Sequence, residues 1–139
     1  MDKPVVQILK TEILERLWGQ EIVVIHTPDY TGKLLKMKKG TRGGLQYHRT
    51  KNEAQYMLSG EMMLEYDKGD GTLSTMTIIA GQSWHIPPGA VHRETALTDC
   101  VILEVSNPVF NDRVRVEEKY GEKFDGGLPT TEEKDIKVG

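Results

Sequence analysis

The chain has 139 residues, of which 37% are hydrophobic and 28% are charged, and its formal net charge is −3. A chain of this length can form one domain that buries about two-thirds of the surface of its unfolded state. Neither a long basic block nor an alternation of basic and aromatic residues is present, so a nucleic-acid partner is not expected.

Membrane and export signals are also missing from the sequence. No apolar run approaches the roughly 20 residues that a membrane span needs, and the first ten residues lack the apolar stretch of a signal peptide. The single cysteine, Cys100, is expected to pack as a small core residue. We expect a cytoplasmic protein with no membrane contact.

Residues 1–20 are expected to form an N-terminal arm. Within this arm, residues 11–18 suit a short amphipathic helix, because Ile13, Leu14, Leu17 and Trp18 would share one helical face. The same residues also suit an edge strand. The sequence leaves both alternatives open.

Residues 21–121 read as short β-prone segments separated by turn residues. The segments lie at 21–26, 33–39, 45–48, 54–58, 61–66, 73–79, 83–86, 91–96 and 100–105. Many short strands at this spacing predict an all-β sandwich or barrel. Between two of them, Asp70 and Gly71 are expected to supply the positive φ angles of a hairpin turn.

Residues 122–139 are charged, contain Gly and Pro, and show almost no hydrophobic periodicity. Such a composition is typical of a poorly ordered polar tail. We therefore expect one domain, with an arm at 1–20, a β-barrel at 21–121 and a tail at 122–139.

Side chains that can bind a metal ion occur in two separate parts of the expected barrel. Gln46 and His48 are two positions apart in a strand, so they point to the same face about 6.6 Å apart. Glu53, at the start of the next strand, can face that pair across a hairpin. The Pro-Pro-Gly turn at 87–89 can aim His92 into the barrel. The predicted ligands are Gln46, His48, Glu53 and His92.

These positions resemble the two signature motifs of the cupin superfamily. The first motif is matched in spacing by Gln46, His48, Glu53 and Gly60, with Gln46 in place of the motif's first histidine. The second motif is matched by Gly81, Pro87, Gly89 and His92, with Ala96 where asparagine is usual. The resemblance implies a single-domain cupin, that is, a double-stranded β-helix or jelly-roll barrel, with a bound metal ion.

Over roughly residues 18–121, the sequence is also similar to the cupin domain of type II mannose-6-phosphate isomerases, or phosphomannose isomerases. The matched positions are Trp18, Gly19, Lys33, Gln46, His48, Glu53, Ser59, Gly60, 86–93 and 112–121. That family binds its metal through a glutamine, two histidines and a glutamate. The resemblance therefore implies that Gln46 is a direct ligand.

Three positions depart from that family's pattern. Thr50 replaces the second histidine of the His-x-His pair, and Lys51 replaces the arginine after it. Glu122 replaces an arginine, which reverses a charge expected near a phosphate. The nucleotidyltransferase domain often fused ahead of this cupin has no counterpart before residue 18, so sugar-nucleotide synthesis is not expected.

The predicted ligand set suits a divalent transition metal, which can be Mn, Fe, Co, Ni or Zn. Four protein ligands on an octahedral ion leave two positions for the carbonyl and hydroxyl oxygens of a sugar, where an enediolate would be stabilised. Lys33 is expected to point inward with Leu35 and Met37, as a base or an anion anchor. Arg93 is expected to hold an anionic substrate with two hydrogen bonds.

Three functions remain open at this point: an aldose–ketose isomerase acting on a sugar or sugar phosphate, an Fe(II) dioxygenase-type cupin that uses only His48, Glu53 and His92, and a non-catalytic binder of small molecules. His85 is expected to line the wall of the site, and His26 to be structural. A homodimer is expected, because single-barrel cupins commonly pair and the segment 21–26 is a plausible covered edge.

Overall fold

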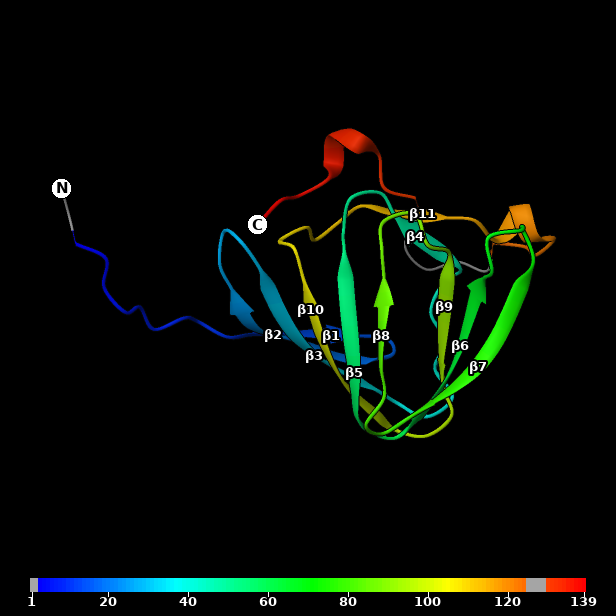
Figure 1. Ribbon diagram of the computed structural model, residues 1–139, viewed down its shortest axis with the longest axis horizontal. Coiled ribbons are helices and arrows are strands. Elements are labelled where there is room, and N and C mark those ends of the chain that lie inside the picture. Colours follow the sequence, from blue (N-terminus) through cyan, green and yellow to red (C-terminus); the bar gives the residue numbers. More distant parts are fainter. Residues whose placement is uncertain (1–2, 125–129) are drawn as a thin grey trace.

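The computed structural model describes residues 3–124 and 130–139, and in these residues eleven strands form two antiparallel sheets (Figure 1). The strands are β1 (Glu12–Arg16), β2 (Gly19–His26), β3 (Thr31–Met37), β4 (Gln46–His48), β5 (Glu53–Ser59), β6 (Glu61–Asp67), β7 (Leu73–Ile79), β8 (Ser83–Ile86), β9 (His92–Ala96), β10 (Cys100–Ser106) and β11 (Arg113–Arg115). Two short 3-10 helices, η1 (Glu117–Tyr120) and η2 (Glu133–Asp135), follow the last strand.

The two sheets face each other as the halves of a jelly roll. The six-stranded sheet has the order β1-β2-β3-β10-β5-β8, and the five-stranded sheet has the order β11-β4-β9-β6-β7. Strands far apart in the chain are therefore neighbours, as expected for this architecture. The predicted all-β barrel is confirmed. No helix in the described ranges is long and apolar enough to cross a bilayer.

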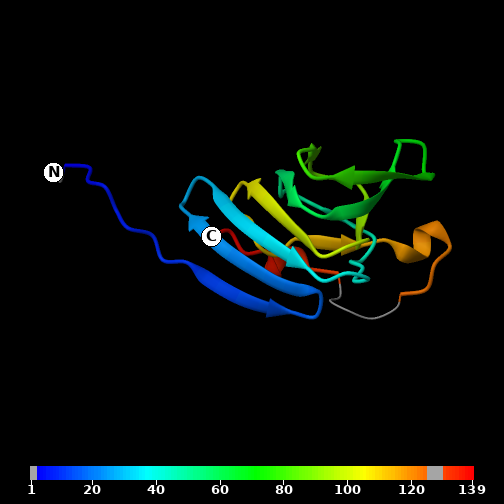
Figure 2. The same ribbon diagram turned by 90° about the horizontal axis from the view of Figure 1, so that it is seen from below.

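Of the two alternatives for residues 11–18, the structure contains the edge strand. Strand β1 pairs with β2, with Ile13 opposite Ile22. Residues 3–11 precede it and extend away from the barrel (Figures 1 and 2). The six-stranded sheet thus begins within the segment expected to be an arm.

The hairpin between β6 and β7 is present, but its turn differs from the prediction. Gly69 and Gly71 have φ angles of 99° and 83°, and no described residue other than glycine has a positive φ. Asp70 instead accepts a hydrogen bond from the Thr72 amide at 3.0 Å. Two glycines therefore provide the positive φ angles, because a left-handed backbone costs less without a Cβ atom.

Residues 130–139 pack along the segment between β10 and β11. Val138 forms a β-bridge with Val109, and the Thr131 amide donates to the Arg113 carbonyl at 2.8 Å. Residues 125–129 of the predicted tail lie outside the described residues. The boundaries of arm, barrel and tail stay predictions.

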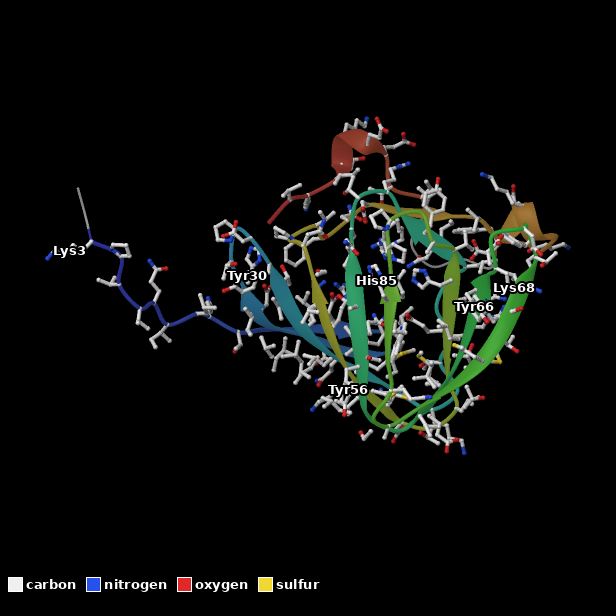
Figure 3. The ribbon with its side chains drawn as sticks, in the orientation of Figure 1. Lys3, Tyr30, Tyr56, Tyr66, Lys68 and His85 are labelled. Atoms are coloured by element: carbon white, nitrogen blue, oxygen red, sulfur yellow. The ribbon has the colours of Figure 1, made fainter. Side chains whose placement is uncertain are left out.

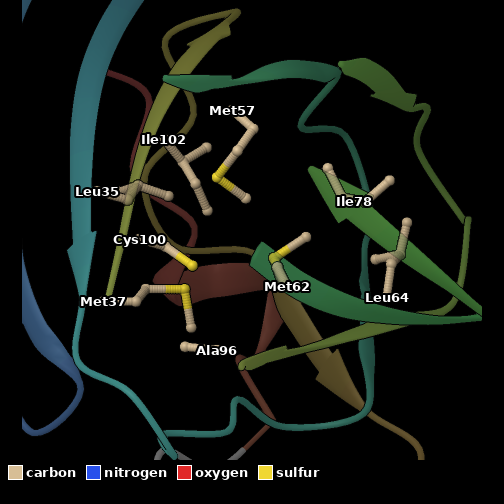
Figure 4. Close-up of a cluster of buried hydrophobic side chains, with 9 residues drawn as sticks. All are labelled: Leu35, Met37, Met57, Met62, Leu64, Ile78, Ala96, Cys100 and Ile102. Atoms are coloured by element: carbon tan, nitrogen blue, oxygen red, sulfur yellow. The ribbon is translucent and has the colours of Figure 1, made fainter. Parts of the chain in front are cut away.

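The hydrophobic core fills one half of the barrel (Figure 4). Alternation places every second side chain inward, and the buried cluster consists of Leu35, Met37, Met57, Met62, Leu64, Ile78, Ala96, Cys100 and Ile102. Further along the same inward faces the side chains become polar, for example Glu104 after Ile102 on β10 and Gln55 before Met57 on β5. The other half of the barrel is thus lined by polar groups.

Replacing Ile102 with alanine tests the position of the core. Ile102 is fully buried, so Ile102→Ala should lower the free energy of unfolding by roughly 2 to 5 kcal/mol through lost burial and a residual cavity. The matched control is Ile79→Ala on β7, because Ile79 is 49% exposed. Chemical denaturation measures both variants, and equal losses would contradict the described core.

Candidate metal centre

The predicted ligands come from both sheets and meet in the polar half of the barrel. Gln46 and His48 lie on β4, and Gln46 is directly opposite His92 on the neighbouring strand β9. Directly opposed residues of an antiparallel pair point to the same face, so these three side chains face inward together. Glu53, at the start of β5, faces them from the six-stranded sheet and is only 3% exposed.

The predicted hairpin between β4 and β5 is wrong. Strand β4 pairs with β9 and β11, whereas β5 pairs with β10 and β8. The two strands belong to different sheets, so Glu53 approaches the histidines across the barrel interior. Residues 49–52 cross from one sheet to the other.

Three donor atoms are close enough to bind one metal ion. His48 Nε2 and His92 Nε2 each lie 4.0 Å from Glu53 Oε1, and the three atoms all lie within 4.8 Å of one another. Two ligands that are each about 2.1 Å from one ion are at most about 4.2 Å apart, so only a small side-chain shift is needed. The donor set of two imidazoles and one carboxylate fits a divalent transition metal.

Hydrogen bonds at the other ring nitrogens fix both imidazoles. His92 Nδ1 donates to the Ala90 carbonyl at 3.0 Å, and His48 Nδ1 donates to Asp112 Oδ1 at 2.8 Å. Each Nε2 therefore keeps its lone pair toward Glu53. Burial lowers the pKa of His48 although the Asp112 hydrogen bond opposes this shift. A neutral imidazole is the form that binds a metal.

Asp112 contacts the predicted ligand His48, and the metal-site prediction did not include it. Its side chain is 1% exposed, and Oδ2 accepts hydrogen bonds from the Thr50 amide at 2.7 Å, the Lys51 amide at 2.8 Å and the Thr50 hydroxyl at 3.1 Å. Burial alone would raise the pKa of Asp112, but the hydrogen bonds from His48 and the two amides lower it well below its usual range. Thr50 thus holds the carboxylate that orients His48.

A row of buried charges continues from Glu53 into the six-stranded sheet. Lys51 Nζ lies 2.8 Å from Glu53 Oε2 and 3.0 Å from Glu104 Oε2, and Gln55 donates to the other Glu104 oxygen at 2.8 Å. Burial and the nearby Glu104 raise the pKa of Glu53 well above its usual range. A cation beside Glu53 would stabilise its charged form.

Lys33 forms the far end of this row. It is 3% exposed on the inner face of β3, together with Leu35 and Met37. Its Nζ lies 2.7 Å from Glu21 Oε1, 3.9 Å from Glu104 Oε2 and 4.8 Å from the centre of the Phe110 ring. Glu104 and Lys51 lie between Lys33 and the predicted ligand Glu53.

The structure does not bring Arg93 to the three donor atoms. Arg93 directly follows the inward-facing His92 and so points to the opposite face of β9. There it binds Glu65 through two hydrogen bonds of 2.7 and 2.8 Å, and Glu122 through two of 2.8 and 2.9 Å. Glu122 stands where the isomerase family has an arginine, and here its carboxylate binds Arg93.

The expectation that His85 lines the site is wrong. His85 lies on β8 between the inward-facing Trp84 and Ile86 and points outward (Figure 3). Its Nε2 is 2.7 Å from Asn52 Oδ1 on the protein surface. His26, expected to be structural, stacks edge-on against Phe110 with ring centres 5.1 Å apart.

Two inward-facing charged residues were not predicted. Glu94 lies two positions after His92 on β9, and Arg113 lies directly opposite His48 on β11. Both side chains are half-buried, and neither makes a side-chain hydrogen bond or ion pair to another residue of the described ranges. Burial raises the pKa of Glu94 and lowers that of Arg113. The two-residue period that starts at His92 is the sequence signal that could have identified Glu94.

Comparisons with known proteins show the family of this chain and support its fold. The family model for the cupin domain matches residues 33–106, and the chain belongs to the cupin family. The comparison with curated proteins gave no match.

Solved structures with a similar fold come from several kinds of protein. The capsular polysaccharide assembling protein CapF from Staphylococcus aureus has a TM-score of 0.67 at 22% identity, with 77% of this chain and 34% of CapF covered. KdgF from a Halomonas species gives 0.59 at 18% identity, with 68% and 85% covered. Bacillus subtilis oxalate decarboxylase, which has Mn(II) centres, gives 0.63 at 20% identity, with 77% and 30% covered.

Each identity is below 25%, so these likenesses support the fold alone. This chain spans about a third of the length of CapF and of oxalate decarboxylase.

Replacing Asp112 with asparagine tests how His48 is oriented. Asp112→Asn removes the anionic acceptor at His48 Nδ1, and the affinity for a divalent transition metal should fall by about 10- to 100-fold. The matched control is Asp99→Asn, because Asp99 accepts a hydrogen bond from the Lys39 amide on the surface. Metal titration of each folded variant gives the result, and unchanged affinity of Asp112→Asn would contradict the proposed orientation.

Proposed function

We propose that this cupin is a metal-dependent enzyme that interconverts the aldose and ketose forms of a sugar or sugar phosphate. The observation that carries the proposal is the convergence of His48 Nε2, His92 Nε2 and Glu53 Oε1 within 4.8 Å, with both imidazoles fixed at Nδ1. The similarity to type II mannose-6-phosphate isomerases supports the reaction class.

His48, Glu53 and His92 would hold the metal, and Gln46 is proposed as the fourth ligand because it is paired with His92 on the inner face of β4. A divalent transition metal bound there supplies Lewis acidity to neighbouring carbonyl and hydroxyl oxygens. Manganese, iron, cobalt, nickel and zinc all suit this donor set.

Unpaired polar atoms support a hydroxyl-rich ligand. Gln55 and Trp84 are directly opposite each other on β5 and β8, one inward position beyond Glu53. Gln55 Oε1 and Trp84 Nε1 are buried and have no hydrogen-bond partner among the described residues. Burying such atoms unpaired costs about 1 to 3 kcal/mol each, which a sugar hydroxyl would recover.

Proton transfer between neighbouring sugar carbons needs a side chain free to carry the proton. Lys33, the group expected from the sequence, already binds Glu21, so we assign it a positioning role through Glu104 and Lys51. The Glu94 carboxylate faces inward beside His92 and has no side-chain hydrogen bond or ion pair within residues 3–124 and 130–139, and we assign the proton transfer to it. Arg113, opposite His48, is assigned to the anionic group of a sugar phosphate in place of Arg93.

Metal content tests the first part of the proposal. Protein purified without chelators should contain a transition metal in stoichiometric amount, and His92→Ala should lose most of it because one donor of the set is removed. His85→Ala is the matched control, since His85 lies on the outer face. Elemental analysis measures all three proteins. A metal-free native protein, or full occupancy of His92→Ala, would contradict the proposed site.

Isotope exchange tests the reaction. Incubation of the native protein with mannose 6-phosphate in deuterated water should label the carbon next to the carbonyl. Glu94→Gln should slow this exchange by at least about 100-fold with unchanged metal content, because general acid–base catalysis typically contributes that much. Glu61→Gln, a change at an exposed position, should leave it unchanged. The absence of exchange across a broad panel of sugars would refute the isomerase proposal.

A second candidate function is supported by the same three atoms. Two histidines and one carboxylate, without Gln46, form the ligand set of non-haem Fe(II) oxygenases. Oxygen uptake by the iron-loaded protein, combined with no sugar exchange, would favour a dioxygenase-type cupin. A loaded metal with neither activity would favour a small-molecule binder.

A further inference from the structure

Tyr66, labelled in Figure 3, is an inward-facing residue beside the candidate metal centre. It lies on β6 directly opposite His92, and directly opposed residues of an antiparallel pair point to the same face, with Cβ atoms about 4.5 to 5.5 Å apart. The buried Met62 and Leu64 precede it at a two-residue spacing, and its ring packs against the buried hydrophobic cluster. The phenol ring therefore lies inside the barrel, next to a proposed ligand.

The hydroxyl group of Tyr66 has no hydrogen-bond partner within residues 3–124 and 130–139. A tyrosine that buries its ring usually finds a partner for its hydroxyl. Tyr120 follows this rule, because its hydroxyl donates to Asp67 Oδ2. The side chain of Tyr66 is only half-buried, so a small molecule can reach it. Tyr66 thus offers an unused hydrogen-bond donor to the barrel interior.

The position of Tyr66 is on the side of the centre from which no predicted ligand comes. In the five-stranded sheet, β9 lies between β4 and β6. Gln46 and His48 approach His92 from β4, so Tyr66 flanks His92 on the opposite side. The predicted ligand set therefore leaves the side next to β6 uncovered.

Two further unpaired polar groups face this side from the other sheet. Strands β7 and β8 are edges of the two sheets, and only residues 80–82 join them, so both edges lie on the same side of the barrel. Trp84 on β8 and its neighbour Gln55 on β5 contain the buried unpaired atoms Nε1 and Oε1. The hydroxyl of Tyr66 therefore adds a third free polar group to the half of the interior that contains these two atoms.

We propose that Tyr66 contacts the substrate, and that its hydroxyl donates a hydrogen bond to the substrate oxygen that gains negative charge in the enediolate. The inference rests on the metal centre of the proposed function. A hydrogen-bond donor aimed at an atom where charge develops stabilises the transition state. Tyr66 would therefore favour substrates with a carbonyl and a hydroxyl on neighbouring carbons, one of them facing β6.

Binding of a charged enediolate analogue tests this contact without turnover. D-Arabinonohydroxamate carries its negative charge on two neighbouring oxygens, as an enediolate does. Titration calorimetry of the cobalt-loaded protein should show that Tyr66→Phe binds this probe at least about tenfold more weakly, because a hydrogen bond to a charged group is lost. The matched control is Tyr56→Phe, which should bind like the native protein because Tyr56 is 40% exposed on the outer face of β5.

Stability and metal content separate a substrate contact from a structural role. Since the Tyr66 hydroxyl has no partner in the described ranges, Tyr66→Phe should keep the native free energy of unfolding and the native cobalt content. A loss of either one would overturn the proposal. In deuterated water, the same variant should slow the exchange of mannose 6-phosphate by about 100-fold, as expected for the loss of one such donor.

The outcomes distinguish Tyr66 from the rest of the site. Equal affinity of the native protein and Tyr66→Phe for the hydroxamate would overturn the role of Tyr66 and leave the metal centre in place. A cobalt-loaded native protein that does not bind the hydroxamate would overturn it as well. A native protein that takes up no cobalt would refute the metal centre and this contact together. Weaker hydroxamate binding by Tyr66→Phe, with no sugar exchange by the native protein, would support the contact and refute only the isomerase reaction.

Discussion

The carboxylate of Asp112 binds both a proposed metal ligand, His48, and the segment between β4 and β5. One oxygen accepts the hydrogen of His48 Nδ1, and the other accepts the amides of Thr50 and Lys51. The first bond orients a proposed ligand, and the other two fix the segment that carries the chain from β4 to β5. The position of Glu53 and the direction of His48 are therefore set by the same side chain.

Buried acidic and basic side chains alternate along a row that begins at the proposed ligand Glu53. The row that begins at Glu53 contains the carboxylates of Glu53, Glu104 and Glu21. Lys51, Lys33 and Arg16 lie within 4.0 Å of them, so the row has equal numbers of acidic and basic groups. Buried charges are stable when they are paired. Burial and the nearby Glu104 disfavour the charged form of Glu53, and a divalent cation beside Glu53 would stabilise that form. The polar half of the barrel is consistent with a ligand that binds next to it.

Local patterns predicted the strands well, because the two-residue period and the glycine turns depend on neighbouring residues. Edge strand β1 stayed ambiguous, since Ile13, Leu14, Leu17 and Trp18 suit a helix as well as a strand. The relation between β4 and β5 was not predictable in this way. Each pairs with strands distant in the chain, and pairing between distant segments leaves no local signal.

The same distinction applies to the side chains of the site. Arg93 follows His92 directly, so strand alternation alone places it on the other face, and the same reasoning identifies Glu94 as an inward neighbour. Asp112 lies 64 positions after His48. No spacing rule connects those two residues, and only the folded chain reveals their contact. His85 was misplaced because the sequence does not state which face of β8 is the inner one.

X-ray absorption spectroscopy of the chain loaded with cobalt or zinc is the most direct test of the central claim. The account predicts only nitrogen and oxygen neighbours at about 2.0 to 2.2 Å, with the outer-shell scattering of two imidazole rings. Substitution of either His48 or His92 should reduce that scattering to one ring. A spectrum with a sulfur neighbour, or one without imidazole scattering, would contradict the proposed centre.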